Sequence, residues 1–208
     1  MMLIAMIAVS SYLIGSIPIG YLAGRLAGVN VRTLGSGNVG ATNVTRVLGK
    51  KYGYPVFLLD AGKGFAAVEV AKGLIVSSGR TASSAELCGI IAAVFAVIGH
   101  TNSIWLGFKG GKGVATSMGA LFALNWLSAI IVGLVWIITF LITRYVSLAS
   151  IAAAVTLPVT MAAMLFLKEL PSAALLYFSL CLASIIIFRH RSNLSRLARG
   201  TEPRFVRK

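Results

Sequence analysis

VATSMGALFALNWLSAIIVGLVWIITFLIT, residues Val114–Thr143, carries no charge over 30 positions and has a single side-chain amide, Asn125, near its middle. At about 1.5 Å per residue, one helix of this length would measure about 45 Å, whereas the hydrocarbon core of a bilayer is about 30 Å thick. The amide divides the stretch into Val114–Leu124 and Trp126–Thr143. The sequence therefore predicts two shorter helices here in place of one long helix.

The composition of the whole chain predicts an integral membrane protein. Of its 208 residues, 58% are hydrophobic and 12% are charged, about half the charged fraction of an average soluble domain. The 19 Lys and Arg outnumber the 5 Asp and Glu, but the basic residues lie in short segments between apolar ones. Positive-inside bias and anionic substrates account for that distribution. A nucleic-acid partner would require the charges on a soluble surface, so we expect none.

The direction of each crossing follows from the distribution of basic residues. Five other segments are apolar and long enough to span a bilayer: Met1–Ala27, Tyr54–Ser78, Ala85–His100, Ser147–Leu167 and Ser172–Phe188. Basic residues follow the first segment and none precedes it, and seven lie after Phe188. With two crossings through Val114–Thr143, both basic regions reach the cytoplasm. We therefore expect one all-α membrane domain over residues 1–208, with seven transmembrane helices, the N-terminus outside and the C-terminus cytoplasmic.

Two spans contain residues that lipid contact alone does not explain. The first has small residues at Gly15, Ser16, Gly20 and Gly24, where a neighbouring helix can approach closely. A kink is expected at Pro18.

The second span contains two acid–base pairs at a spacing of three residues, Asp60 with Lys63 and Glu69 with Lys72. Residues at this spacing share a helix face, so each pair can neutralise itself. Structural pairing is the leading interpretation for both pairs. Lys63 is also a candidate for substrate binding, because it lies near the cytoplasmic end of the span.

The glycine–lysine loop, GFKGGKGVAT over residues 107–116, has the composition of a phosphate site. Glycine amides can surround an oxyanion, and the lysines supply positive charge. The loop does not match GxxxxGK[ST] and follows no strand, so it is not a nucleotide-binding P-loop. A solvated basic loop between two spans is the alternative. The candidate residues here are Lys109, Gly110, Gly111, Lys112 and Gly113.

The longest interruption of the hydrophobic pattern runs from Gly28 to Gly53. The first loop, residues 34–46, lies within it and includes LGSGNVGATN. Its glycines permit close backbone approach, its hydroxyls and amides donate hydrogen bonds without charge, and Arg46 offers a planar fork to a phosphate. A simple turn between helices is the alternative. The candidates are Ser36, Gly37, Asn38, Gly40, Thr42, Asn43 and Arg46.

The C-terminal tail, residues 189–205, is the third polar segment. His190 and Asn193 lie one helical turn apart, and Glu202 is the only acid among seven basic residues after Phe188. An anchor for anionic lipid is the alternative for the outer arginines. Under the seven-span topology, the tail and the two loops all face the cytoplasm.

The three polar segments contain, in this order, SGNVGATN, FKGGKGVAT, and RHRSN followed by GTEP. In order and hydrophobic context, they resemble the three motifs of the bacterial acyl-phosphate:glycerol-3-phosphate acyltransferases (PlsY type). The resemblance covers the whole chain. It implies an enzyme of the bacterial plasma membrane with a cytoplasmic site. It also implies transfer of a fatty acyl group from acyl phosphate to the 1-position of sn-glycerol 3-phosphate, the first committed step of phospholipid synthesis, without a cofactor or metal.

The resemblance also implies roles for the candidate residues. Glycerol 3-phosphate would be held by Ser36, Arg46, Lys109, His190 and Asn193. The acyl phosphate would be held by the segment from Gly37 to Asn43, which includes Thr42, and by Ser147. The acceptor's own phosphate would assist deprotonation of the attacking hydroxyl, with His190 as the alternative base.

Two features of the sequence bear on competing functions. Other glycerolipid acyltransferases use a His and an Asp four residues apart in the chain, and no His-x4-Asp occurs here. A transporter or channel for a phosphorylated small molecule is the alternative function. Transporters commonly show inverted repeats and bind ions near the bilayer midplane, whereas this chain shows no such repeat and its loop glycines and lysines cluster at one predicted membrane face. Besides the two substrates and membrane lipids we expect no partner, and we expect a monomer.

Overall fold

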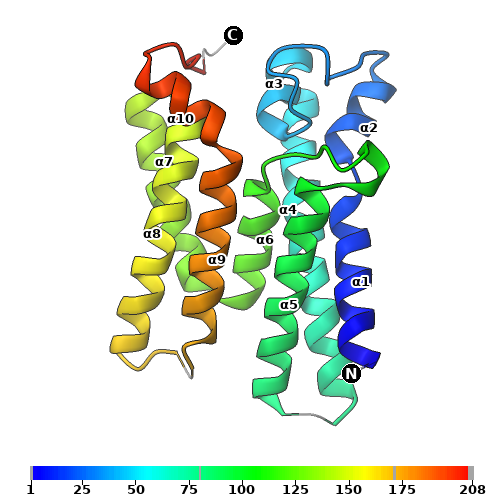
Figure 1. The fold of residues 1–208 in the computed structure, drawn as a ribbon, viewed down its shortest axis with the longest axis vertical. Helices are drawn as coiled ribbons and strands as arrows, with labels where there is room; N and C mark the ends of the chain where they lie inside the picture. The colour runs from blue at the N-terminus through cyan, green and yellow to red at the C-terminus, as the bar shows by residue number, and fades with distance from the viewer. Residues whose placement is uncertain (1, 80, 171, 206–208) are drawn as a thin grey trace. The chain divides into compact units, whose positions relative to one another are not determined.

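The computed structural model describes residues 2–79, 81–170 and 172–205, and these form helices and connecting loops without any strand. The chain divides into two compact units, Met1–Leu124 and Asn125–Lys208. The first unit contains α1 (Met2–Ser16), α2 (Ile19–Leu26), α3 (Ala41–Leu48), α4 (Lys50–Ser77), α5 (Ala82–Thr101), the 3-10 turn η1 (Ile104–Leu106) and α6 (Val114–Leu124). The second contains α7 (Trp126–Thr143), α8 (Val146–Phe166), α9 (Ala174–Arg189) and α10 (Arg191–Ala198). Figure 1 labels these helices.

In the first unit, glycines bring α1 and α5 into close contact (Figure 1). A methyl group added to Gly15 would overlap the backbone of Ala96, and one added to Gly99 would overlap the carbonyl of Tyr12. The small residues of the first span therefore allow close packing, as the sequence predicted. Gly20 allows close approach of the first loop in place of α5, because a methyl group added to it would overlap the carbonyl of Val39. The expected kink is also present, as a break between α1 and α2 at Ile17–Pro18.

Helix α6 packs against α4 through a second pair of glycines. Added methyl groups at Gly64 and Gly119 would overlap the carbonyls of Thr116 and Ala61, respectively. Such close approach lets an 11-residue helix bury one face despite its length. Its last turn also receives a side-chain donor, because Lys72 Nζ lies 3.0 Å from the carbonyl oxygen of Ala123 and 2.9 Å from Glu69 Oε1. Lys72 thus satisfies a carbonyl that a helix ending in an apolar medium would otherwise leave unpaired.

The predicted division of Val114–Thr143 is confirmed at Asn125. Helix α6 ends at Leu124 and α7 begins at Trp126. Asn125 adopts an extended conformation, and its side-chain oxygen accepts a hydrogen bond of 2.9 Å from the backbone N–H of Ser128. This is an N-cap, which satisfies one of the free N–H groups at the start of α7.

The second unit is built on α8, which contacts both α7 and α9 (Figure 1). Helices α9 and α10 meet at an angle of 59° immediately after His190. Helix α10 has two arginines, two serines and an asparagine among its eight residues, so the chain changes here from an apolar helix to a polar one. The bend therefore marks the end of the last apolar segment.

Four segments of the described chain are long and apolar enough to cross a membrane, and the α9–α10 pair would make a fifth. They are Met2–Leu26, Ala82–Leu106, Trp126–Thr143 and Val146–Phe166. Helix α4 has 28 residues but carries the two acid–base pairs, and α6 is short. The described residues therefore form an all-helical protein with four or five segments suited to a membrane, while seven crossings and their direction stay predictions.

Candidate functional site

Asn43 organises the first loop from inside. The side chain is 1% exposed; its oxygen accepts from the N–H of Ser36 at 2.8 Å, and its nitrogen donates to the carbonyls of Val31 and Leu34 at 3.0 and 3.1 Å. These bonds use the side-chain amide to close the loop upon itself. Asn43 therefore supports the conformation of the loop, and Ser36 is left exposed on its surface.

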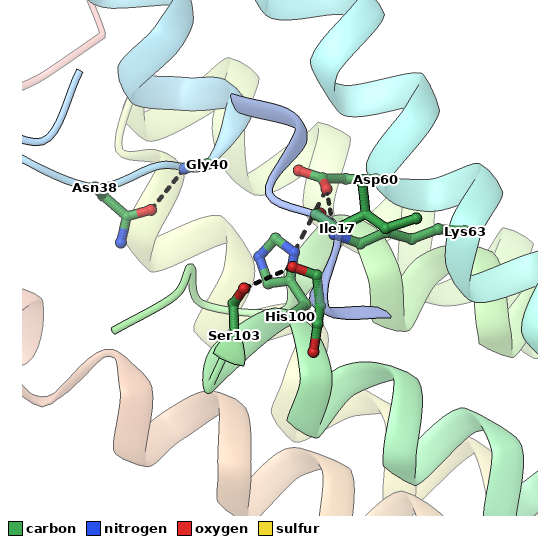
Figure 2. A network of polar contacts seen from close by, with 8 residues as sticks. Ile17, Asn38, Gly40, Asp60, Lys63, His100 and Ser103 are labelled. Atoms are coloured by element: carbon green, nitrogen blue, oxygen red, sulfur yellow. Dashed lines mark hydrogen bonds and ion pairs between the residues drawn. The ribbon is translucent and has the colours of Figure 1, made fainter. Parts of the chain in front are cut away.

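The glycines of the first loop are not equivalent. Gly35 and Gly37 have φ of 60° and 69°, the left-handed region that glycine adopts without strain. Gly40 has φ of −75° and precedes α3, so it does not need glycine for its backbone angle. Its N–H donates to Asn38 Oδ1 at 2.8 Å (Figure 2). Thr42 lies in the first turn of α3, where backbone N–H groups lack partners within the helix.

The glycine–lysine loop folds back onto the end of α5. The N–H of Gly110 donates to the carbonyl of Thr101 at 3.1 Å, and the N–H of Gly111 donates to that of His100 at 3.0 Å. The expectation that these two amides are free to surround an oxyanion is therefore wrong, because they complete hydrogen bonds that the last turn of α5 leaves open. Lys109, immediately before them, is exposed.

A buried cluster of charged side chains lies beside the break between α1 and α2 (Figure 2). Lys63 Nζ lies 2.7 Å from Asp60 Oδ1 and donates to the carbonyl of Ile17 at 2.9 Å. His100 Nδ1 lies 3.4 Å from the same Asp60 oxygen, and Ser103 Oγ donates to the carbonyl of Ser16 at 2.6 Å. A small pocket opens among these groups.

The cluster joins α4 and α5 to the end of α1. The side chains of Asp60 and Lys63 are 2% and 6% exposed. Because solvent does not reach them, each charge is stabilised by its partner. The pair at spacing three is therefore structural, as the sequence predicted. Lys63 nevertheless lines the pocket and keeps its candidacy for substrate binding.

Glu202 accepts hydrogen bonds from three polar side chains of the second unit. Its Oε1 accepts from Ser147 Oγ at 2.6 Å and from Asn193 Nδ2 at 2.7 Å, and its Oε2 accepts from Arg196 Nε at 2.7 Å. The tail is further held by the N–H of Phe205, which donates to the carbonyl of Arg144 at 2.8 Å. Two candidates that are 46 residues apart in sequence, Ser147 and Asn193, are thus brought together by one carboxylate.

The environment of Glu202 favours its ionised form. Burial opposes ionisation, but the hydrogen bonds from Ser147, Asn193 and Arg196, together with the positive charge of Arg196, outweigh that effect and hold the pKa of Glu202 below its ordinary value. The carboxylate is therefore an acceptor at neutral pH and not a proton donor.

His190 has a defined tautomer. Its Nδ1 lies 2.8 Å from the carbonyl oxygen of Ile186, and because a carbonyl only accepts, Nδ1 must carry a proton. Nε2 is then the nitrogen at which a neutral His190 can accept a proton. The side chain is 2% exposed, at the bend between α9 and α10.

Neither Glu202 nor His100 was predicted to belong to the site, although both contact candidate residues. The charge of Glu202 could have indicated its role, because it is the one acid in a basic tail. The sequence does not say which of its many possible partners it binds. Within the described residues, no group of three His, Cys, Asp or Glu side chains could hold a metal ion.

These observations describe a helical membrane protein whose polar loops are rich in glycine, amide and basic side chains. Residues 5–200 match the family model for glycerol-3-phosphate acyltransferase, and the chain belongs to this family. This assignment favours the expected acyltransferase over a transporter or channel.

Similar proteins span the whole chain. Glycerol-3-phosphate acyltransferases from Synechococcus sp. (strain JA-2-3B'a(2-13)) and Aquifex aeolicus (strain VF5) are 45% and 44% identical to it; the alignments cover 100% and 96% of this chain and 98% and 97% of those proteins. The glycerol 3-phosphate form of PlsY, an integral membrane glycerol 3-phosphate acyltransferase, has a TM-score of 0.84 and 42% identity, over 98% of this chain and 96% of that one. Its lysophosphatidic acid form has a TM-score of 0.83 and 41% identity, over 98% and 95%.

Proposed function

We propose that this acyltransferase takes its fatty acyl group from acyl phosphate and transfers it to the 1-hydroxyl of glycerol 3-phosphate. The family assignment supports glycerol 3-phosphate as acceptor, and the related crystal structures are named for that acceptor and for a lysophosphatidic acid. The donor is inferred from the motifs, which resemble those of the acyl-phosphate-dependent enzymes. Lysophosphatidate and inorganic phosphate are the products.

The acceptor is assigned to basic and polar side chains of the three polar segments. Arg46 and Lys109 are exposed cations suited to the acceptor phosphate. Ser36 carries an exposed hydroxyl that can also hydrogen-bond to the acceptor. His190 and Asn193 complete the set. Asn193 also donates to Glu202, so the carboxylate fixes the orientation of its amide.

The donor phosphate is assigned to the start of α3. Gly37, Asn38 and Gly40 lead into this helix, and Thr42 lies in its first turn, where free N–H groups and the helix dipole favour an anion. Asn43 fixes the loop that precedes the helix. Ser147 and Lys63 are further donor-binding candidates, followed by Lys112 and Gly113 of the glycine–lysine loop.

The reaction needs positioning more than activation. The 1-hydroxyl oxygen attacks the acyl carbon, the bond from that carbon to the phosphate oxygen breaks, and phosphate leaves with the electron pair. Because phosphate is a good leaving group, holding the 1-hydroxyl against the acyl carbonyl carbon and stabilising the developing negative charge can supply most of the acceleration. The hydroxyl proton passes to the acceptor's phosphate, with Nε2 of His190 as the alternative acceptor of this proton.

We infer that the enzyme works in the bacterial plasma membrane with its polar loops on the cytoplasmic face and seven crossings. The basic residues that follow the first span and those of the tail support this orientation through the positive-inside rule. The break at Asn125, between α6 and α7, supports an additional crossing at this point. A monomer suffices for this activity.

The donor is tested by incubating the purified enzyme with radiolabelled glycerol 3-phosphate and one of three donors: palmitoyl phosphate, palmitoyl coenzyme A or palmitoyl acyl carrier protein. We expect lysophosphatidate from palmitoyl phosphate alone. Product from either thioester at a comparable rate would overturn the donor assignment, and no product from any donor would overturn the function.

A further inference from the structure

The ring of His100 lies directly beneath the glycine–lysine loop. A methyl group placed on Gly111 would overlap Nε2 of this ring, and its next neighbours are Cε1 and Cδ2 of the same ring at 2.9 and 3.0 Å. The loop is also joined to the backbone of His100 through the N–H of Gly111. His100 therefore supports one residue of the loop with both its ring and its carbonyl.

The ring itself is held from the other side by Asp60. His100 is 7% exposed, and its Nδ1 lies 3.4 Å from Asp60 Oδ1 (Figure 2). Asp60 is in turn fixed by Lys63, whose ammonium also donates to the carbonyl of Ile17 at the break after α1. A continuous series of contacts thus runs from the α1–α2 break, through α4, to the loop.

We propose that His100 is a positioning residue: its ring, held by Asp60, fixes Gly111 and thereby the placement of Lys109 and Lys112. The importance of the two lysines rests on the proposed function, whereas the support of the loop by the ring does not. Phosphate binding by a lysine improves when the backbone that carries it is already ordered, because less conformational entropy is then lost on binding.

The choice of glycine at 111 follows from this arrangement. Its backbone angle is not in the left-handed region, so the absence of a side chain is required by the ring and not by the backbone. Gly110 provides the contrast, because a methyl group there would overlap the backbone carbonyl of His100 and lie 2.9 Å from the carbonyl carbon of Thr101. Changing the side chain at 100 can make room for a methyl group at 111 but not at 110.

This difference defines a double-mutant test. Gly111→Ala and Gly110→Ala are made in the native enzyme and in a His100→Asn background. Asparagine keeps an amide near the position of Nδ1, facing Asp60, but lacks Nε2 and Cε1, the two ring atoms nearest to a methyl group at 111. His100→Ala serves as a second background should the asparagine variant fold poorly.

Two readouts are measured for each variant: hydrogen exchange of the peptide that covers the glycine–lysine loop, and KM for glycerol 3-phosphate. We expect Gly111→Ala to accelerate exchange and raise KM in the native background, and the effect on each to shrink about fivefold or more in the His100→Asn background. Gly110→Ala should keep its full effect in both backgrounds. Equal effects of Gly111→Ala in the two backgrounds would overturn the proposal. Hydrogen exchange decides the matter even in a protein that makes no lysophosphatidate.

Discussion

Removing the carboxylate of Glu202 tests whether the tail is part of the folded second unit. Glu202→Ala leaves three donors without their acceptor, at Ser147, Asn193 and Arg196. The side chain of Glu202 is 7% exposed, and removing one partner of a buried ion pair costs about 3–5 kcal/mol. Because Arg196 is 41% exposed, solvent compensates part of its loss, and we expect about 3 kcal/mol. For a chain of this length that corresponds to a fall in Tm of about 6–12 °C.

The measurement is thermal unfolding of the purified protein in detergent, with two matched variants. Glu202→Gln retains an oxygen for Ser147 and Asn193 but presents an N–H to Arg196, so its Tm should fall by an intermediate amount. Glu169→Ala removes an exposed acid of the same unit and should change stability by less than about 0.5 kcal/mol. A Glu202→Ala protein with the Tm of the native chain would show that Glu202 does not hold the tail to the second unit.

The contribution of Glu202 also has a defined pH dependence. Its pKa in the folded protein lies below the ordinary value of 4.5, so the stabilisation is complete above that pH and is lost as the pH falls through the folded pKa. We expect the Tm values of the native and Glu202→Ala proteins to differ at neutral pH and to converge at acid pH. A difference that grows on acidification would show that the carboxylate is not held in its ionised form.

Three further predictions concern the substrates and the topology. Lys109→Ala should raise KM for glycerol 3-phosphate and cost about 2–4 kcal/mol of transition-state stabilisation in a folded protein; unchanged kinetics would contradict its role. Thr42→Ala should affect the KM for acyl phosphate most and Arg46→Ala that for glycerol 3-phosphate, and equal changes in both constants would argue against separate sites. In a background without native cysteines, an impermeant maleimide should label a cysteine at Asn125 on intact cells and spare one at Ser195; the opposite result would reverse the topology.

The helices of this protein could largely be predicted from the sequence, because hydrophobic length and the need to satisfy backbone groups act locally. The division at Asn125 is the clearest case: the apolar stretch is too long for one crossing, and the residue at the break is a preferred N-cap. The two acid–base pairs followed from the three-residue spacing on one helix. The motif residues were found through composition, since glycine, amide and basic side chains are uncommon in an apolar chain.

Long-range partners were not predictable in the same way. Glycine-rich loops suggest free amides, but the amides of Gly110 and Gly111 are bound to the end of α5, a fact that depends on how the loop folds back. The backbone angle of Gly40 is likewise set by its place before α3 and not by its residue type. Glu202 had seven basic residues in its neighbourhood of the sequence, and its selection of Ser147, Asn193 and Arg196 is a property of tertiary structure.

In the proposed reaction, the acyl group passes directly from acyl phosphate to glycerol 3-phosphate, without a covalent enzyme intermediate. Rapid-quench measurement of phosphate release from radiolabelled acyl phosphate, at enzyme concentrations near that of the substrate and with the acceptor omitted, tests this claim directly. We expect no rapid release of phosphate until glycerol 3-phosphate is added. A burst of phosphate equal to the enzyme concentration in the absence of acceptor would reveal an acyl-enzyme and rule out direct transfer.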